Sequence, residues 1–262
     1  MKKVLILAVI MLFAATSAFA ATSIVNSKHN LTRNSQTIYN TEATGQICVY
    51  CHTPHGANTG FPGAPLWNKA TPSGSYTLYG TTVANHTPIA GGPTGSSLAC
   101  LSCHDGVQAI NSIVNQAGAG GYNAGGTNIA WTAPSTLAGI AVKMTSAGNA
   151  AANLGQDLSN DHPISIQYQA GSASLKAKNT ALTSWIGATM IQDVLRTSGA
   201  NTDLVECASC HAVHDDSNGM FLRASNSSFG NGARERRCDR TSTETYVAGA
   251  MPRANARSRK RI

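Results

Sequence analysis

Three copies of the pattern C-x-x-C-H constrain this chain more than any other feature. They run from Cys48 to His52, from Cys100 to His104 and from Cys207 to His211. The pattern is the attachment signature of c-type haem, in which two thiols form thioethers with the vinyl groups and the histidine ligates the iron. We therefore predict three covalent haems c, attached at Cys48, Cys51, Cys100, Cys103, Cys207 and Cys210, with His52, His104 and His211 as proximal iron ligands.

A C-x-x-C pair can also form a zinc site, a thioredoxin-type redox pair or a structural disulfide. None of these three uses requires a histidine directly after the second cysteine. That histidine is present in all three copies, which favours haem attachment. The seventh cysteine, Cys238, is followed by Asp239 and is left unassigned.

The N-terminus has the features of a secretory signal peptide. Lys2 and Lys3 precede an apolar run from Val4 to Ala15, and Ala18-Phe19-Ala20 forms a small-x-small cleavage site. The alternative is a membrane anchor, but the apolar run is short for a bilayer span. We predict that residues 1–20 are removed and that the mature protein is exported, to the periplasm, the outer membrane surface or the medium, with no membrane span.

Composition indicates a fold organised by cofactors rather than by a large apolar core. Aromatic residues make up 6% of the chain and charged residues 12%, while glycine numbers 25. So few large side chains bury little apolar area. We expect a mostly irregular fold with a few short helices and little sheet, in which one multihaem cytochrome c domain (21–228) is built around stacked haems. Within it we expect loop or weak strand over 106–160, a helix over 182–196, and no exact internal repeat.

Five further histidines are candidates for the opposite axial position of the irons. His55 and His214 each follow a proximal histidine by three residues, which is too close to reach the other face of the same haem. They are therefore expected to ligate a neighbouring haem. His162 is followed by a proline that stiffens the backbone and preceded by an aspartate that could orient the ring. The full set of candidate distal ligands is His29, His55, His86, His162 and His214. Methionine is the alternative axial ligand, and Met220 lies beside a motif, but histidine is in excess.

The motif segments resemble the multihaem cytochromes of Geobacter-type metal-reducing bacteria, above all their four-haem, extracellular, filament-forming members. The resemblance covers roughly residues 24 to 228. It is carried by CVYCHTPHG from Cys48, LACLSCHDG from Leu98, NDHPI from Asn160, and ECASCH from Glu206 with the later Phe221-Leu222-Arg223. It implies low-potential, bis-histidine haems that pass respiratory electrons to extracellular iron or manganese oxides or to electrodes. It also implies that His55 ligates a haem of the adjacent subunit in a homopolymer.

The C-terminal segment departs from that resemblance, which calls for a fourth C-x-x-C-H after Asn226. Residues 229–262 contain none, and carry nine Lys and Arg against three acidic residues. Residues 21–228 carry eight against nine. One interpretation is a basic, disordered arm for nucleic acid, anionic lipid or an acidic partner. The favoured one is a frameshift product that replaces a fourth haem segment, in which case the intact protein would hold a fourth haem.

Three classes of function are compatible with these motifs. The favoured one is electron transfer without catalysis, with other redox proteins or extracellular acceptors as partners and no nucleic acid. The second is a multihaem reductase for nitrite or a sulfur oxyanion, which needs an iron with an open distal position. Five spare histidines argue against an open iron, and there is no C-x-x-C-K motif. The third, a haem sensor or adhesin, would need a further domain that this length scarcely accommodates.

Overall fold

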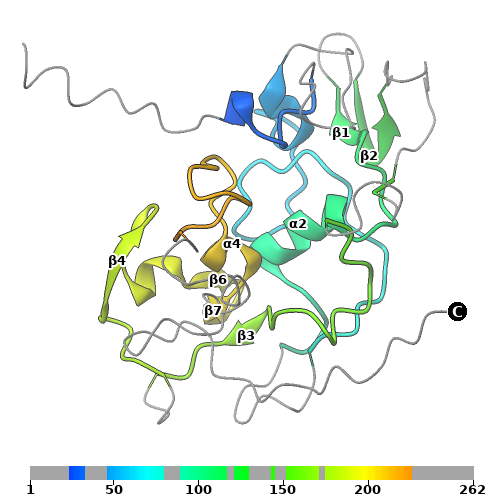
Figure 1. Ribbon diagram of the computed structural model, residues 1–262. Coiled ribbons are helices and arrows are strands. Elements are labelled where there is room, and N and C mark those ends of the chain that lie inside the picture. The colour runs from blue at the N-terminus through cyan, green and yellow to red at the C-terminus, as the bar shows by residue number, and fades with distance from the viewer. Residues whose placement is uncertain are drawn as a thin grey trace, which may run out of the picture.

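The computed structural model describes residues 24–32, 46–79, 89–116, 121–129, 143–144, 152–170 and 175–225. The predicted signal peptide, the basic tail, His86 and Cys238 lie outside these ranges. Within them the chain is mostly coil, with short helices and small antiparallel sheets (Figure 1). The predicted irregular fold, with few helices and little sheet, is confirmed to this extent.

The helices of the described ranges are short, and three of them hold the cysteine motifs. They are η2 (Ile24–Asn26), η3 (Ile47–Tyr50), α2 (Gly95–His104), η5 (Ile191–Val194) and α4 (Cys207–Cys210). The buried face of α2 consists mainly of small residues, which allow a close approach by α4. At that approach the backbone N–H of Cys207 donates to Ser97 Oγ over 2.9 Å. The second and third motifs are therefore packed against one another.

The strands form three antiparallel sheets. β1 (Ser112–Asn115) pairs with β2 (Tyr122–Asn128), and β4 (Ala181–Trp185) pairs with β5 (Ala188–Met190). The third sheet has the order β3-β7-β6, with bounds Ile166–Gln167, Asn201–Val205 and Arg196–Ser198. β1 and β2 lie within 106–160, where we expected loop or weak strand.

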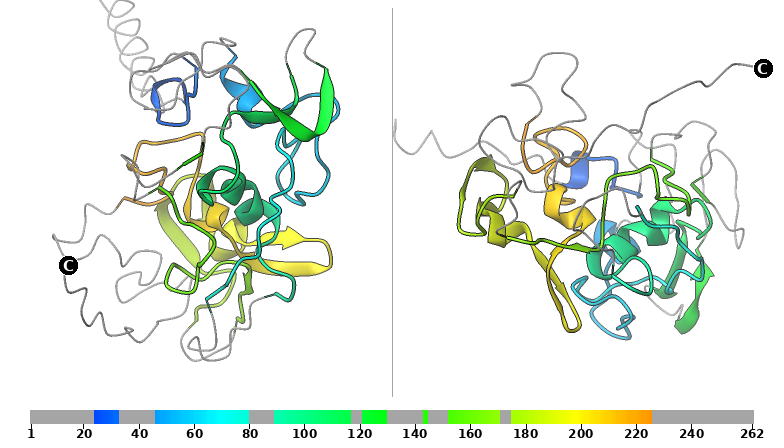
Figure 2. Two further views of the ribbon diagram at one scale, coloured as in Figure 1. Left: turned by 90° about the vertical axis from the view of Figure 1, so that its right-hand side faces the viewer. Right: turned by 90° about the horizontal axis from the view of Figure 1, so that it is seen from below.

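α2 and α4 lie in the middle of the molecule, between the β1–β2 hairpin on one side and the other two sheets on the other (Figures 1 and 2). Each side has its own small apolar cluster. The cluster beside the first motif contains Tyr50, Ile113 and Ile129. The cluster beside the third motif contains seven residues, among them Ile166 and Val205. In the described part of the chain these two clusters are separate, and the motif segments lie between them.

The prediction of a helix over 182–196 is wrong. The chain there forms β4, a turn at Gly187 with φ +65°, β5, η5 and the start of β6. Leu182, Ile191 and Val194 are buried in one cluster as an amphipathic helix would require, but the hairpin and η5 bring them there. The Asp193 carboxylate accepts N–H bonds from Thr189 and Met190, which fixes this non-helical turn. Tertiary burial therefore outweighed the apparent helical spacing.

None of the helices that the structure describes combines the length and the apolar character needed to cross a membrane.

Candidate haem centre

Each C-x-x-C-H motif is folded onto a short helix that ends at or just before its histidine. In the first and third motifs the histidine N–H donates to the carbonyl of the first cysteine, from His52 to Cys48 over 2.8 Å and from His211 to Cys207 over 3.0 Å. In the second motif, His104 is the last residue of α2. All six motif cysteines carry free thiols. One turn of helix thus presents two thiols and an imidazole from the same segment.

Each of the three motif histidines makes the same kind of hydrogen bond, from its ring to a backbone carbonyl, and this bond fixes the tautomer of the ring. The Nδ1 atoms lie 2.8 Å from Pro65 O for His52, 2.7 Å from Ala152 O for His104, and 2.9 Å from Met220 O for His211. A carbonyl oxygen only accepts, so Nδ1 carries the proton and donates it. The Nε2 lone pair is then available for a metal, as in most metal-bound histidines.

Burial keeps two of these rings neutral, which is the form that binds iron. The pKa values of His104 and His211 are both lowered, chiefly by burial. For His211, the neighbouring His162 and His104 lower the pKa further. A neutral imidazole with Nδ1 protonated is the state expected of a proximal ligand.

Two returning segments, one after the first motif and one after the third, make the same contacts. After the first motif, Thr53 N donates to Leu66 O over 2.9 Å and Asn68 N donates to Cys51 O over 2.8 Å. Together with the bond from His52 to Pro65, three hydrogen bonds link the motif to residues 65–68. Leu66 has φ 56°, an uncommon conformation for leucine.

The third motif repeats this arrangement with residues 220–223. Ala212 N donates to Phe221 O over 2.7 Å, and Arg223 N donates to Cys210 O over 2.8 Å. Phe221 has φ 57°, which matches Leu66 in value and in position. The first and third motifs therefore belong to a local structural repeat of motif and return segment. The sequence contains no exact repeat, and this local one is not visible in it because the intervening loops differ in length.

His214 lies beside the first motif rather than beside its own. Its ring centre is 6.2 Å from that of His52, and the ring planes are inclined at 37°. A metal–imidazole bond is about 2 Å long, so two imidazoles bound to opposite sides of one ion have ring centres about 6.3 Å apart. Any angle about the common axis is compatible with that arrangement. The separation of the His52 and His214 ring centres is compatible with that arrangement.

His29 makes an equivalent pair with the second motif. Its ring centre lies 6.2 Å from that of His104, with an angle of 70° between the planes. The other face of His29 stacks on Phe221, with 4.1 Å between centres and 10° between planes. His29 also hydrogen-bonds the backbone of Val213, and burial lowers its pKa to about 4. This ring is therefore held neutral and oriented.

The remaining candidate ligands are His162, His55 and His86. His162 is exposed but near enough to His211 to lower its pKa, which makes it the candidate partner of the third motif. His55 is exposed, and its carbonyl accepts hydrogen bonds from Thr53 Oγ1 and Asn115 Nδ2, so its backbone is fixed while its imidazole faces outward. His86 lies outside the described residues.

The second motif contacts the first on one side and the third on the other. The thiols of Cys100 and Cys207 hydrogen-bond, and this bond raises the pKa of Cys100 and lowers that of Cys207. The Cys51 thiol interacts with that of Cys103, and burial raises the pKa of Cys51 to about 12. The attachment points therefore follow one another in the order first, second, third.

Two side chains of α2 tie the neighbouring motifs to it. Trp67, in the return segment of the first motif, donates from Nε1 to Ser102 Oγ over 3.1 Å. On the other side Glu206, 1% exposed, accepts from Thr94 Oγ1 over 2.8 Å and from Ser165 Oγ. Its carboxylate also accepts from the backbone and side chain of Ser97 in the first turn of α2. A carboxylate at a helix N-terminus stabilises the helix.

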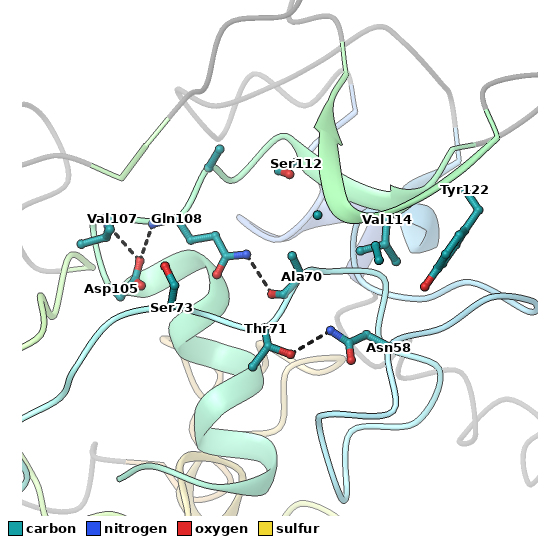
Figure 3. A pocket seen from close by; sticks show the side chains of 13 residues that line it. Asn58, Ala70, Thr71, Ser73, Asp105, Val107, Gln108, Ser112, Val114 and Tyr122 are labelled. Carbon is teal, nitrogen blue, oxygen red and sulfur yellow. Dashed lines mark hydrogen bonds between the residues drawn. The ribbon is translucent and has the colours of Figure 1, made fainter. Parts of the chain in front are cut away.

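A polar cavity of about 650 Å³ lies beside the end of α2 (Figure 3). Asn58, Thr71 and Gln108 are among the residues that line it, and no motif cysteine or histidine is among them. It is therefore separate from the attachment points.

Among the residues that the structure describes, no group of three His, Cys, Asp or Glu side chains is arranged around a common metal position. A haem iron takes two axial ligands from the protein, and the histidine pairs described above supply that number. The free thiols, the proton on each Nδ1 and the paired imidazoles fit covalent haem. The carbonyls of Pro65, Ala152 and Met220 were not predicted, because no sequence pattern marks a carbonyl that a distant loop brings to the ring.

No family model matches the sequence, and no curated protein matches it.

Proposed function

We propose that this chain is an electron-transfer protein that holds three covalent c-type haems with histidine on both axial sides. The observation that carries the proposal is the 6.2 Å separation of the imidazole centres in two pairs, His52 with His214 and His29 with His104. Each pair joins a motif histidine to a candidate distal histidine from a distant segment. Bound haem iron would supply reversible one-electron exchange.

The residues themselves would attach, orient and ligate. The paired thiols of each motif would form the thioethers, and the Nδ1–carbonyl bonds would hold each proximal ring at one angle. His214, His29 and His162 would fill the distal positions of the first, second and third motifs. Such ligation leaves no iron open to a substrate, which favours electron transfer over the nitrite or sulfur oxyanion reductase.

The contacts between motifs support a continuous path for electrons. Cys51 interacts electrostatically with Cys103, and Cys100 hydrogen-bonds with Cys207, so each attached group would have its neighbour close by. The partners would be other redox proteins or extracellular acceptors such as metal oxides, after export of the mature chain.

The local repeat also supports a homopolymer. His55 occupies, after the first motif, the place that His214 occupies after the third. His214 is turned toward a different motif, and His55 is exposed with nothing comparable beside it in the described residues. Because the three distal positions would be filled within each chain, His55 would ligate a fourth haem in a second copy of the chain. A fourth haem belongs to this proposal only if the natural C-terminus differs from residues 229–262.

The first test is the intact mass of the exported protein together with its visible spectrum. We expect the mass of residues 21–262 plus three haems, a low-spin spectrum in both redox states, and no rapid carbon monoxide binding to the reduced protein. A mass without haem would contradict attachment. Three haems that all bind carbon monoxide rapidly would instead contradict bis-histidine ligation and favour the reductase.

A further inference from the structure

Lys69 is a buried cation beside the first motif. Its side chain is 0% exposed, and Nζ donates to the carbonyl oxygen of Ile110. In the described part of the chain no carboxylate pairs with it; the ion pair found there joins Lys178 to Asp203. A buried ammonium without a counter-charge is costly, so its presence calls for an explanation in its surroundings.

The backbone places Lys69 next to the attachment point. Asn68, the residue before it, donates its N–H to Cys51 O over 2.8 Å and its Nδ2 to Val49 O over 2.6 Å. The ammonium is near enough to the Cys51 thiol to favour its thiolate form. The charge therefore acts on the position where a haem would be attached.

Hydrogen bonds hold residues 69–71 in place, which keeps the Lys69 ammonium beside the first motif. The carbonyl of Lys69 accepts from Asn58 Nδ2 over 2.9 Å, and that of Ala70 accepts from Gln108 Nε2 over 2.8 Å. Asn58 also donates to Thr71 Oγ1 over 3.0 Å; the bonds at Ala70 and Thr71 are drawn in Figure 3. Lys69 is thus held at its backbone carbonyl and at Nζ.

Reduction of a haem adds one negative charge, and a nearby fixed cation stabilises that charge. The effect is strong in the interior, where the effective dielectric constant is low. The charge beside the second motif has the opposite sign. Asp105, which follows His104, is 2% exposed and accepts hydrogen bonds from Val107 N, Gln108 N and Tyr76 Oη.

We infer that Lys69 is a potential-setting residue, a fixed cation that raises the reduction potential of the haem attached at Cys48 and Cys51 above that of the haem attached at Cys100 and Cys103. The inference rests on the proposed function and adds to it a direction of electron transfer. Electrons would collect at the first motif rather than at the second. Lys69 acts through its charge and ligates nothing.

The test compares four holoproteins by redox titration, with haem methyl NMR signals assigned to each motif. Lys69→Gln keeps a donor and removes the charge, Lys69→Arg keeps the charge, and Lys178→Gln removes a surface lysine as the control. We expect Lys69→Gln alone to lower the midpoint potential at the first motif, with a smaller shift or none at the third.

An unshifted potential in Lys69→Gln, with three low-spin haems retained, would overturn the inference and leave the proposed function standing. Equal shifts in Lys69→Arg and Lys69→Gln would overturn it too, because repacking would then be the cause. If Lys69→Gln fails to mature, the test uses the wild-type protein. A midpoint potential at the first motif that is lower than the one at the second would then contradict the inference. Absence of covalent haem would overturn the proposed function and this inference together.

Discussion

The imidazole of His214 lies with its centre 6.2 Å from that of His52, although the two rings belong to different motifs. His214 follows the third motif histidine by three residues and would therefore be unable to reach the far side of a haem attached to that motif. A turn closed by the hydrogen bond from Asp215 N to Ala212 O follows the third motif, and the His214 ring lies beside the first motif instead. Loss of His214 should consequently affect a haem attached elsewhere in the sequence.

The His214→Ala variant should leave one haem of the three with an open axial position. We expect the low-spin signal to fall by about a third, a high-spin signal to appear, and carbon monoxide to bind one haem equivalent in the reduced protein. Optical and EPR spectra of the purified holoprotein measure this. NMR should assign the altered haem to the first motif; assignment to the third would contradict the pairing with His52.

His29 should give the same result at another haem. His29→Ala removes the ring that faces His104 and leaves the second motif with one axial ligand. It also exposes one face of Phe221, so a small loss of stability should accompany the spectral change. His29→Met offers a sharper readout, since methionine in place of histidine raises the potential of that one haem. A potential raised at another motif would contradict the pairing.

From the sequence, the candidate residues of the site could be named, but the contacts that they make could not. The C-x-x-C-H copies name the candidate thiols and proximal rings without any structure, because spacing along one helical turn is local. His29 could be named only as a candidate, since its approach to His104 depends on Phe221 and on a long-range fold. Pairings of this kind come from loop closure between distant segments, which periodicity does not encode.

The same dependence on contacts between distant segments explains the errors in the predicted fold. The irregular architecture followed from glycine content and scarce large side chains. The apolar residues of 182–196 were recognised as a buried set, yet a hairpin and a short helix place them in the cluster rather than one helix. The repeat shared by 65–68 and 220–223 is one of backbone hydrogen bonds and positive φ angles, and the residue types at those positions differ.

His55→Ala should separate assembly from folding. The ring of His55 is exposed, so its removal should leave the haem count, the spectra and the thermal stability of the monomer nearly unchanged. Where the natural chain holds a fourth haem, polymers should be lost, because that haem in the adjacent subunit would lose its axial ligand. Size-exclusion chromatography and electron microscopy of wild type, His55→Ala and His214→Ala measure this. Ordered filaments of His55→Ala would rule out the proposed intersubunit ligation.

Asn68 should be a strong determinant of stability at the first motif. It is fully buried, its Nδ2 donates to Val49 O and Asn115 O, and its Oδ1 accepts from Asn115 N. Asn68→Ala would leave these backbone groups unpaired in the interior. This should lower the unfolding free energy by about 2–4 kcal/mol. Asn123→Ala, at an exposed position of β2, is the matched control and should change the unfolding free energy by under about 0.5 kcal/mol. Denaturant titration of the holoproteins measures both.

The unfolding free energy of the protein should depend on pH through the ionisation of Glu206. Burial raises the pKa of its carboxyl above that of an unfolded glutamate, so the folded protein binds this proton more tightly. The resulting contribution to stability is complete below the ordinary pKa and is lost as pH rises through the raised value. Glu206→Gln keeps an acceptor for Thr94 and Ser165 and does not titrate. The unfolding free energy of Glu206→Gln relative to wild type should therefore increase from pH 4 to pH 7.

Asp193→Asn provides the control for that series, because N–H bonds from Thr189 and Met190 lower the pKa of Asp193. This carboxylate is already ionised above pH 5 in both states, so the difference between Asp193→Asn and wild type should stay constant from pH 5 to pH 7. Measuring differences between variants removes the contribution of every group that titrates alike in both proteins. A flat difference for Glu206→Gln over the same range would mean that the Glu206 carboxylate is as well stabilised beside α2 as it is in water.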